Sequence, residues 1–166
     1  MKQAAAGLLA ALMALSPVPA VALSCEEYSI RDAYWRYQAA EETYVLVFGA
    51  FLDLKKTRAK AEGYPGGAEV WTAKFTGHGF SRRAFDKPFE TGVTLIFPDF
   101  SDIAGGYNTA DLADWLPGKR GLVWLKKTAA GYQLAAGLCQ PLLDTKAANV
   151  KPALQCLRGG YCPKSN

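Results

Sequence analysis

The positions of the four cysteines constrain the fold of this chain more than any other feature. Cys25 stands alone near the N-terminus, whereas Cys139, Cys156 and Cys162 all lie near the C-terminus. Four cysteines allow three pairings. We favour Cys25–Cys139 together with Cys156–Cys162, because the second bond closes a short loop whose Gly159-Gly160 pair can turn tightly. The first bond then ties the beginning of the mature chain to its end, and in the chain-entropy model such a long loop contributes about 4–5 kcal/mol of stability.

The first 22 residues have the pattern of a secretory signal peptide. Lys2 supplies a positive charge, residues 4–15 form an uncharged apolar run too short to span a bilayer easily, and two prolines then end any helix. Ala20-Val21-Ala22 is a small-x-small cleavage site. We therefore expect residues 1–22 to be removed and residues 23–166 to form one disulfide-stapled domain, periplasmic or secreted, with no transmembrane segment.

An oxidising compartment favours disulfides over the alternative use of these cysteines, which is a zinc site. The chain has no Cys-x-x-Cys pair, and its single histidine is His78. We therefore expect neither a metal nor another cofactor. The formal net charge of +4 is too small to indicate a nucleic-acid partner.

Hydrophobic periodicity predicts a mainly β domain. The strongest strand signal covers residues 43–54, where the interior Gly49 predicts a bulge or a sharp bend. Residues 55–67 are predicted to form a loop. Further strands are expected at 69–79, 91–97, 122–127 and 132–138, and the last two are expected to form a hairpin. Helices are expected over residues 29–40, capped by Ser29, over a short segment that ends at Trp115, and over residues 144–157.

Five adjacent strands joined by turns and long loops favour a closed antiparallel sheet over a doubly wound parallel one. Interior glycines are typical of strands that coil strongly. The sequence therefore predicts a five-stranded antiparallel OB-like barrel with an N-terminal and a C-terminal helix.

The order of several segments also carries a family resemblance. Cys25 precedes a helical segment, IRDAYWRYQAA, and a strand with a central glycine, YVLVFGAF; near the end, LVWL is followed by GYQLAAGLC. This order resembles the netrin-module and tissue-inhibitor-of-metalloproteinase group over roughly residues 25–139. It is also similar to uncharacterised exported bacterial proteins of that general shape. The resemblance implies an OB barrel whose N-terminal cysteine is bonded to the region after the last strand. The chain departs from the group's pattern in beginning Cys25-Glu26-Glu27 instead of Cys-x-Cys, and in lacking further cysteines in mid-chain.

Three chemical identities remain open for Cys25. As a disulfide staple it explains architecture only. As a lipid attachment point it would anchor the protein to a membrane, although Ala22-Leu23-Ser24 is a poor match to a lipobox. In the resembled family a free N-terminal amine and its cysteine carbonyl chelate the zinc of a target enzyme, which here requires cleavage directly before Cys25.

The sequence offers no established catalytic constellation. His78 lies in Thr76-Gly77-His78-Gly79, and no Gly-x-Ser-x-Gly motif accompanies it. Paired acids such as Asp111 and Asp114 are more typical of helix capping and solubility than of a glycosidase. We therefore assign no catalytic residue.

A binding function is the remaining hypothesis. OB barrels bind oligonucleotides and oligosaccharides with aromatic side chains over a basic groove. The residues that would form such a face here are Trp71, Phe75, Trp124, Tyr132, Lys55, Lys56 and Arg58. The alternative for the aromatics is the hydrophobic core. We expect an exported, non-catalytic binding protein for a protein or an envelope glycan; the alternatives are an inhibitor of a secreted metallo-hydrolase and an enzyme of unrecognised type. The oligomeric state is left open.

Overall fold

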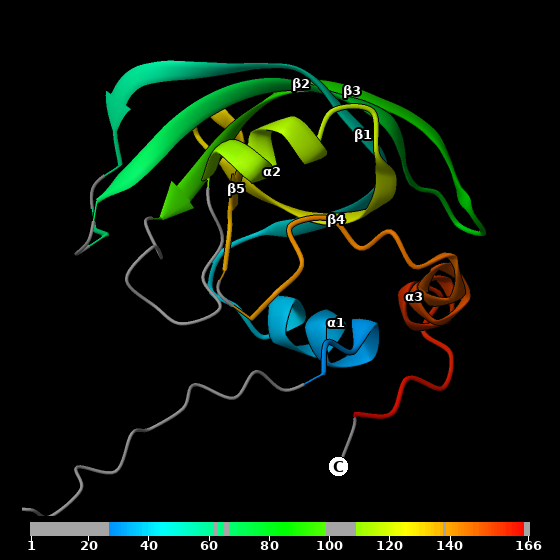
Figure 1. Cartoon of the computed structure of the whole chain (residues 1–166). Helices are drawn as coiled ribbons and strands as arrows, with labels where there is room; N and C mark the ends of the chain where they lie inside the picture. The colour runs from blue at the N-terminus through cyan, green and yellow to red at the C-terminus, as the bar shows by residue number, and fades with distance from the viewer. Residues whose placement is uncertain (1–26, 62, 65–66, 99–108, 138, 165–166) are drawn as a thin grey trace, which may run out of the picture.

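The computed structural model describes residues 27–61, 63–64, 67–98, 109–137 and 139–164, and within them the chain is mainly β. Its helices flank one five-stranded sheet (Figure 1). In chain order the elements are α1 (Ile30–Gln38), β1 (Tyr44–Lys60), β2 (Ala68–Phe80), β3 (Phe85–Pro98), α2 (Thr109–Trp115), β4 (Arg120–Thr128), β5 (Gly131–Ala135), a 3-10 helix η2 (Ala147–Asn149) and α3 (Val150–Leu157).

The strands pair in the order β1-β2-β3-β5-β4, and β4 pairs again with β1, so the sheet closes into a ring. Four of the pairings are antiparallel, whereas β3 and β5 run parallel over residues 93–96 and 132–135. The prediction of a purely antiparallel sheet is therefore wrong. The reason is geometric: strand direction reverses at every antiparallel pair, so a closed ring with an odd number of strands must contain at least one parallel pair.

Glycines allow neighbouring strands of the ring to approach closely. Gly49 of β1 lies opposite Gly77 of β2 and opposite Gly121 of β4. A Cβ atom on Gly49 would lie 2.3 Å from the carbonyl oxygen of Thr76 and 2.7 Å from the Cα of Gly77. The register runs through Gly49 without a shift, so the predicted bulge is absent there. Gly49 is required for close approach instead.

The interior of the ring holds the main hydrophobic core. The strand side chains that are completely buried in it come from four strands: Phe51, Phe75, Leu95, Phe97 and Leu125. Leu116, which follows α2, is also completely buried in this cluster, and Leu112 of α2 packs against it; Figure 1 shows α2 beside the ring interior. Burial of each large apolar side chain contributes about 1.5–3 kcal/mol, so this core is the main source of stability for the ring.

A second core lies outside the ring, where α1 and α3 flank β4 (Figure 1). Ile30 and Ala153 from the helices form one buried cluster with Leu122 and Trp124 of β4. Because Val123 faces the inner core, β4 is buried on both faces. A strand buried on both faces reads as a continuous apolar run, which explains the sequence LVWL.

Strand β1 is longer than the sequence predicted. It continues to Lys60, so residues 55–60 belong to a strand and not to the expected loop. Its register against β2 shifts between Leu52 and Lys55, where Asp53 has a φ of 53°. The charged side chains do not prevent strand formation, because Lys55 and Lys56 are exposed to solvent.

The helices follow the predictions in part. Ser29 caps α1 as predicted, since its hydroxyl accepts a hydrogen bond from the backbone N–H of Asp32 at 3.4 Å. The predicted helix over residues 144–157 is shorter, because η2 precedes it and α3 begins at Val150. Pro152 lies in the first turn, where a helix has no backbone hydrogen bond to lose. No helix among the described residues has both the length and the apolar character needed to cross a membrane.

Candidate binding surface

The four aromatic residues of the predicted binding face do not assemble on the surface. Phe75 is fully buried inside the ring, with its ring centroid 5.2 Å from that of Phe51. Trp124 is 6% exposed and lies in the outer core, stacked on Tyr37. The prediction is therefore wrong for both residues. Alternation along β2 turns Phe75 inward, and the helices cover the outer face of β4.

The other two aromatics are half-buried at the edge of the inner core. The indole N–H of Trp71 donates a hydrogen bond to Glu69 at 3.0 Å, while its ring packs edge-on against Phe97. Tyr132 packs against Phe89 with ring centroids 5.2 Å apart. Both side chains contribute to packing, so neither offers a free aromatic face comparable to a stacking platform.

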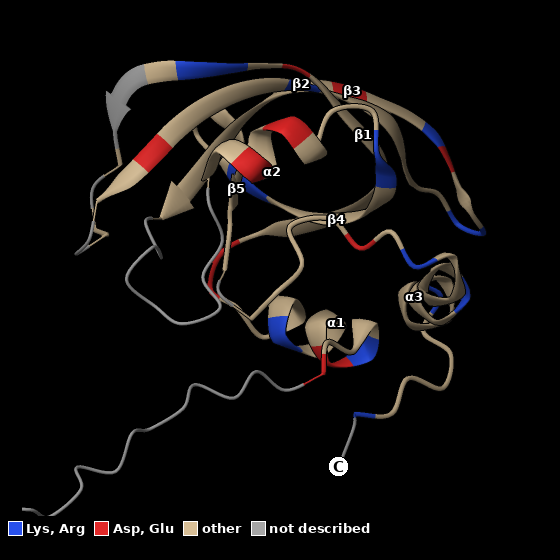
Figure 2. Ribbon diagram, in the orientation of Figure 1, with Lys and Arg blue, Asp and Glu red and all other residues tan. Residues whose placement is uncertain are grey.

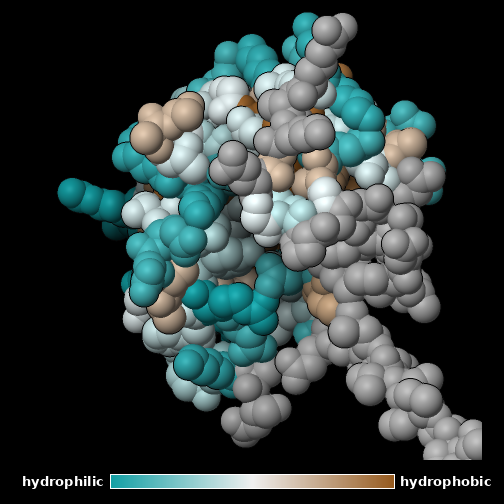
Figure 3. Space-filling view, turned by 90° about the vertical axis from the view of Figure 1, so that its left-hand side faces the viewer, coloured by the Kyte–Doolittle hydropathy of each residue, from teal (hydrophilic) through white to brown (hydrophobic). Residues whose placement is uncertain are grey.

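The predicted basic residues lie on β1. Lys55 and Lys56 are exposed, and Lys56 forms an ion pair with Glu69; Arg58 belongs to the same strand, and its side chain is outside the described set. Other basic residues lie on the opposite side of the molecule, on α3 and the β2–β3 turn (Figure 2). On the face that Figure 3 shows, the described residues are mostly hydrophilic or of intermediate hydropathy, with scattered hydrophobic patches.

The cysteines follow the prediction where they are described. Cys156 and Cys162 form a disulfide with a Cα–Cα distance of 5.0 Å, and no described cysteine is free. The predicted Cys25–Cys139 bond involves Cys25, which lies outside the described residues, as do the cleavage site and the lipidation site.

The disulfide at the end of α3 directs the C-terminal segment across α1. The indole N–H of Trp35 donates a hydrogen bond to the backbone carbonyl oxygen of Cys162 at 2.8 Å. The Lys164 ammonium lies 5.8 Å from the centroid of the Trp35 ring, in a cation–π contact. Helix α1 and the C-terminal segment are thereby joined across 127 sequence positions.

The short loop closed by this disulfide displays an aromatic residue. Tyr161 is 78% exposed, the highest fraction among the large hydrophobic residues exposed in the described structure. Arg158 ends α3 beside it, and Gly159 takes a φ of 72° that allows the chain to turn. Backbone N–H groups of Gly159 and Gly160 donate to carbonyl oxygens within α3, each at 3.0 Å. The loop is therefore fixed at both ends and through its turn.

We call the group Trp35, Arg158, Tyr161 and Lys164 the tail surface. It combines two exposed aromatic side chains with two exposed cations, and none of the four is in an ion pair with a described residue. Single exposed apolar residues are ordinary. Here the disulfide closes the loop that carries Tyr161, and a side-chain hydrogen bond holds Trp35. Exposed aromatic residues that are held in this way suit binding, because protein–protein interfaces are enriched in Tyr, Trp and Arg.

A small cavity lies between α1, β4 and residues 137 and 140–142, lined in part by Tyr28, Tyr37, Trp124 and Gln140. Tyr37 donates a hydrogen bond to Gln140 at 2.9 Å. The buried Trp124 indole N–H makes no hydrogen bond with a described residue. The volume of about 20 Å³ suits one water molecule, so the cavity is too small for an organic substrate.

Burial dominates the electrostatics of this cavity. It raises the pKa of Tyr28 above the usual 10.0, and the nearby Asp144 carboxylate raises it further. Burial also raises the pKa of Tyr37, with a smaller contribution from Tyr44. Both phenols therefore remain protonated in the folded protein at neutral pH, and they act as packed hydrogen-bonding groups in the outer core.

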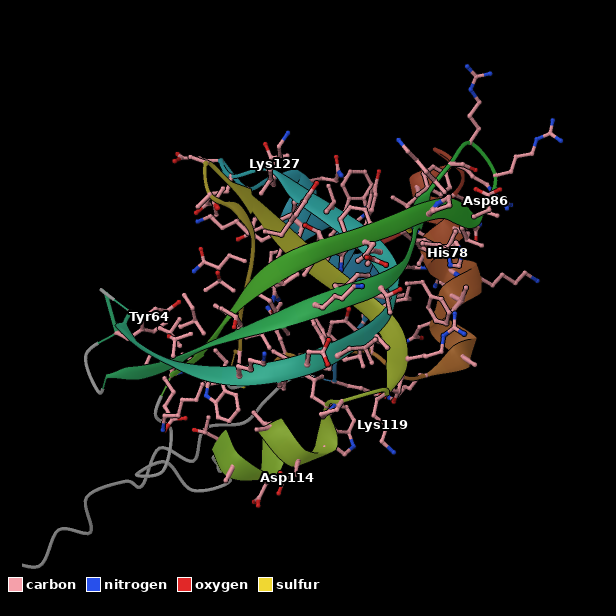
Figure 4. All side chains as sticks on the ribbon, turned by 90° about the horizontal axis from the view of Figure 1, so that it is seen from above. Tyr64, His78, Asp86, Asp114, Lys119 and Lys127 are labelled. Carbon is pink, nitrogen blue, oxygen red and sulfur yellow. A yellow bond between two sulfur atoms is a disulfide. The ribbon has the colours of Figure 1, made fainter. Side chains whose placement is uncertain are left out.

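The described residues do not assemble a catalytic centre around His78. Its Cα lies opposite those of Phe48 and Pro88 in the sheet, and its imidazole makes no hydrogen bond or ion pair with a described residue. His78 and Asp86 lie at the same end of the molecule as α3 (Figure 4). Among the described residues no group of three His, Cys, Asp or Glu side chains could hold a metal ion.

In comparisons with known proteins, neither a family model nor a curated protein matches the chain. The interpretation of the tail surface therefore depends on its own geometry.

Sequence reasoning missed Trp35, Tyr161 and Lys164. A usable signal was present for two of them. Tyr34, Trp35 and Tyr37 spread over more than one face of a helix, so one of them had to face outward. A disulfide between positions six apart closes a loop too short to bury all of its residues, which favours exposure of Tyr161, directly before Cys162. No comparable signal marked Lys164.

Proposed function

We propose that this protein is an exported, non-catalytic binding protein that recognises a protein or a cell-envelope component through the tail surface. The observation that carries the proposal is the exposure of Trp35 and Tyr161 together with the contacts that fix them. Trp35 is held by its hydrogen bond to Cys162 and by the Lys164 cation–π contact, and Tyr161 lies in the loop that the disulfide closes. Aromatic and arginine side chains of this kind provide most of the binding energy in many interfaces. A surface that is already ordered loses less conformational entropy on binding.

We further propose that the ring of strands is an OB-like barrel that serves as a rigid support. The strand order β1-β2-β3-β5-β4, its closure through β1 and β4, and the placement of α2 between β3 and β4 support this proposal. OB folds are five-stranded Greek-key barrels. In this proposal the binding site lies on the flanking helices and the C-terminal segment, because β4 is covered on its outer face by α1 and α3.

Site-specific photo-crosslinking in the source cells tests the proposed function. A benzophenone amino acid replaces Tyr161 in one variant and Trp115 in a second. Trp115 serves as the control because it is also an exposed aromatic residue, 42% exposed against 78% for Tyr161, and lies on α2, outside the tail surface. We expect an adduct of defined mass in the envelope fraction from position 161 and none from position 115.

The adduct must also depend on the neighbouring cations. We expect R158E and K164E to reduce its yield at least about tenfold, which corresponds to about 1.4 kcal/mol of binding energy. K127E, which reverses an exposed charge away from α3 (Figure 4), is expected to leave it unchanged. The proposal would be contradicted if positions 161 and 115 gave equal yields of adduct. It would also be contradicted if neither R158E nor K164E changed the yield from position 161.

Export and the state of Cys25 are tested by intact mass and N-terminal sequencing of the protein from the envelope fraction. The proposal predicts cleavage after Ala22 and a mass four hydrogens below that of the fully reduced chain, because each of the two disulfides removes two hydrogens. An N-terminus at Cys25 would favour the inhibitor alternative, and a lipid-sized mass increment would favour the anchored form. A protein that retains residues 1–22 in the cytoplasm would refute export.

A further inference from the structure

A second surface lies beside the tail surface along α3. Ala153, which belongs to the outer core, and Cys156, which forms the disulfide, are each 1% exposed. On another side of the helix, a shallow open depression of about 840 Å³ includes Val150, Lys151 and Leu154 and continues to Arg158. Positions 150, 154 and 158 follow helical spacing, so a short apolar row is bordered by two cations.

The β2–β3 turn adds further positive charge. The guanidinium of Arg158 donates a hydrogen bond to the carbonyl oxygen of Arg83, which brings the turn and the end of α3 together. Arg82 and Arg83 are exposed, and a hydrogen bond between Ser81 N–H and the Ala84 carbonyl oxygen orders the turn. Figure 2 shows the basic residues of the turn and of α3 on the same side of the molecule.

This positive charge is not neutralised within the described structure. Lys151 and Arg158 are both exposed, and neither they nor the turn arginines pair with a described carboxylate. Asp86 is the acidic residue of the adjoining segment 81–87. Unpaired cations around an apolar row are complementary to a ligand that carries carboxylates and apolar groups together.

We propose that the α3 surface, defined as Val150, Lys151, Leu154, Arg158, Arg82 and Arg83, binds an acidic amphipathic peptide segment of a partner protein. The inference rests on the proposed binding function and specifies its partner. Apolar side chains of the segment cover Leu154, and its carboxylates pair with the surrounding cations. An anionic glycan could pair with the cations of this surface, but it has no aliphatic side chain that could pack on Leu154.

Fluorescence polarisation tests this assignment with three probes. The first is a labelled synthetic peptide of repeated Glu-Glu-Leu-Phe, and the second has serine in place of Leu and Phe. The third is labelled heparin, a polyanion without apolar side chains. Sedimentation with phosphatidylglycerol vesicles measures binding to an anionic membrane. We expect the first peptide to bind at least about tenfold more tightly than the second, and more tightly than heparin, with no vesicle binding.

Variants locate the site. K151E and L154S are each expected to weaken the first peptide at least about tenfold, whereas K127E, a matched charge reversal away from α3 (Figure 4), leaves it unchanged. Circular dichroism checks that L154S remains folded, and K151E provides the test if it does not. Equal binding of both peptides, tighter binding of heparin or vesicles, or equal loss with K127E would overturn the inference. An adduct at position 161 that persists when the peptide fails to bind would refute the acidic-peptide partner and leave the proposed function standing.

Discussion

Replacement of Gly49 by alanine is expected to destabilise the ring strongly, because the new methyl group has no space. Its carbon would lie 2.3 Å from the Thr76 carbonyl oxygen, 2.7 Å from the Gly77 Cα and 2.7 Å from the Phe75 ring. Two of these atoms belong to the backbone of β2, which also pairs with β3. Relief therefore requires β1 and β2 to move apart by about 1 Å, which weakens the hydrogen bonds on both sides of the contact.

The expected cost follows from two terms. Overpacking a core usually costs about 1–3 kcal/mol, and each weakened backbone hydrogen bond adds about 1 kcal/mol. We expect G49A to lose about 4 kcal/mol, which is a large part of the roughly 5–15 kcal/mol typical of a domain. Urea unfolding followed by tryptophan fluorescence and by far-ultraviolet circular dichroism measures the loss without reduction of the disulfides.

Gly92 supplies the matched control. It also lies within a strand, β3, but a Cβ there would meet nothing within 4 Å. Because glycine inside a strand costs about 0.5–1 kcal/mol relative to alanine, G92A is expected to be neutral or slightly stabilising. Gly77 forms the other side of the same close contact between β1 and β2, so G77A should resemble G49A. A G49A variant within about 1 kcal/mol of G92A would refute the close-approach explanation.

Three further predictions concern the outer core and the surface. Burial raises the pKa of Tyr28. The protonated phenol therefore contributes its full stability below pH 10.0, and that stability is lost as the pH rises above 10.0. Y28F should reduce this loss of stability at alkaline pH, measured by unfolding at several pH values. The hydrogen bond from Lys126 lowers the pKa of Glu42, so the pair stabilises the fold above pH 4.5, and this stabilisation is lost as the pH falls below it. K126M should raise the pKa of Glu42 in an NMR titration. An unchanged pKa would contradict the pairing. The double variant C156S/C162S should lose about 2 kcal/mol of unfolding free energy, because the unfolded chain regains loop-closure entropy. It should also lose the crosslinked adduct at position 161. An unchanged adduct would show that the disulfide does not order the loop.

Much of the fold follows from local pattern. Ser29 predicted the start of α1 because capping involves neighbours only, and the apolar run 122–125 predicted β4 because burial on both faces is visible in the sequence. The Cys156–Cys162 bond followed from its spacing. These features depend on interactions across a few residues, which a single sequence specifies directly.

The errors come from long-range packing. Alternation along β2 shows that Trp71 and Phe75 share a face, but it does not show whether that face is core or surface. The closure of the ring decides the question by enclosing Phe75. The parallel β3–β5 pairing likewise depends on the order of the strands, and the position of the Trp35 indole depends on its hydrogen bond to Cys162, far along the chain.

The C-terminal segment links stability to the proposed recognition. Cys156 is buried, with 1% of its surface exposed, whereas Tyr161, within the same disulfide loop, is exposed to solvent. Removal of the disulfide therefore changes both properties and cannot separate them. Replacement of Tyr161 by alanine removes a side chain that buries little surface, so it should alter stability by less than about 0.5 kcal/mol. If Tyr161 is a binding residue, that variant loses recognition with its unfolding curve unchanged; if it is structural, both change together.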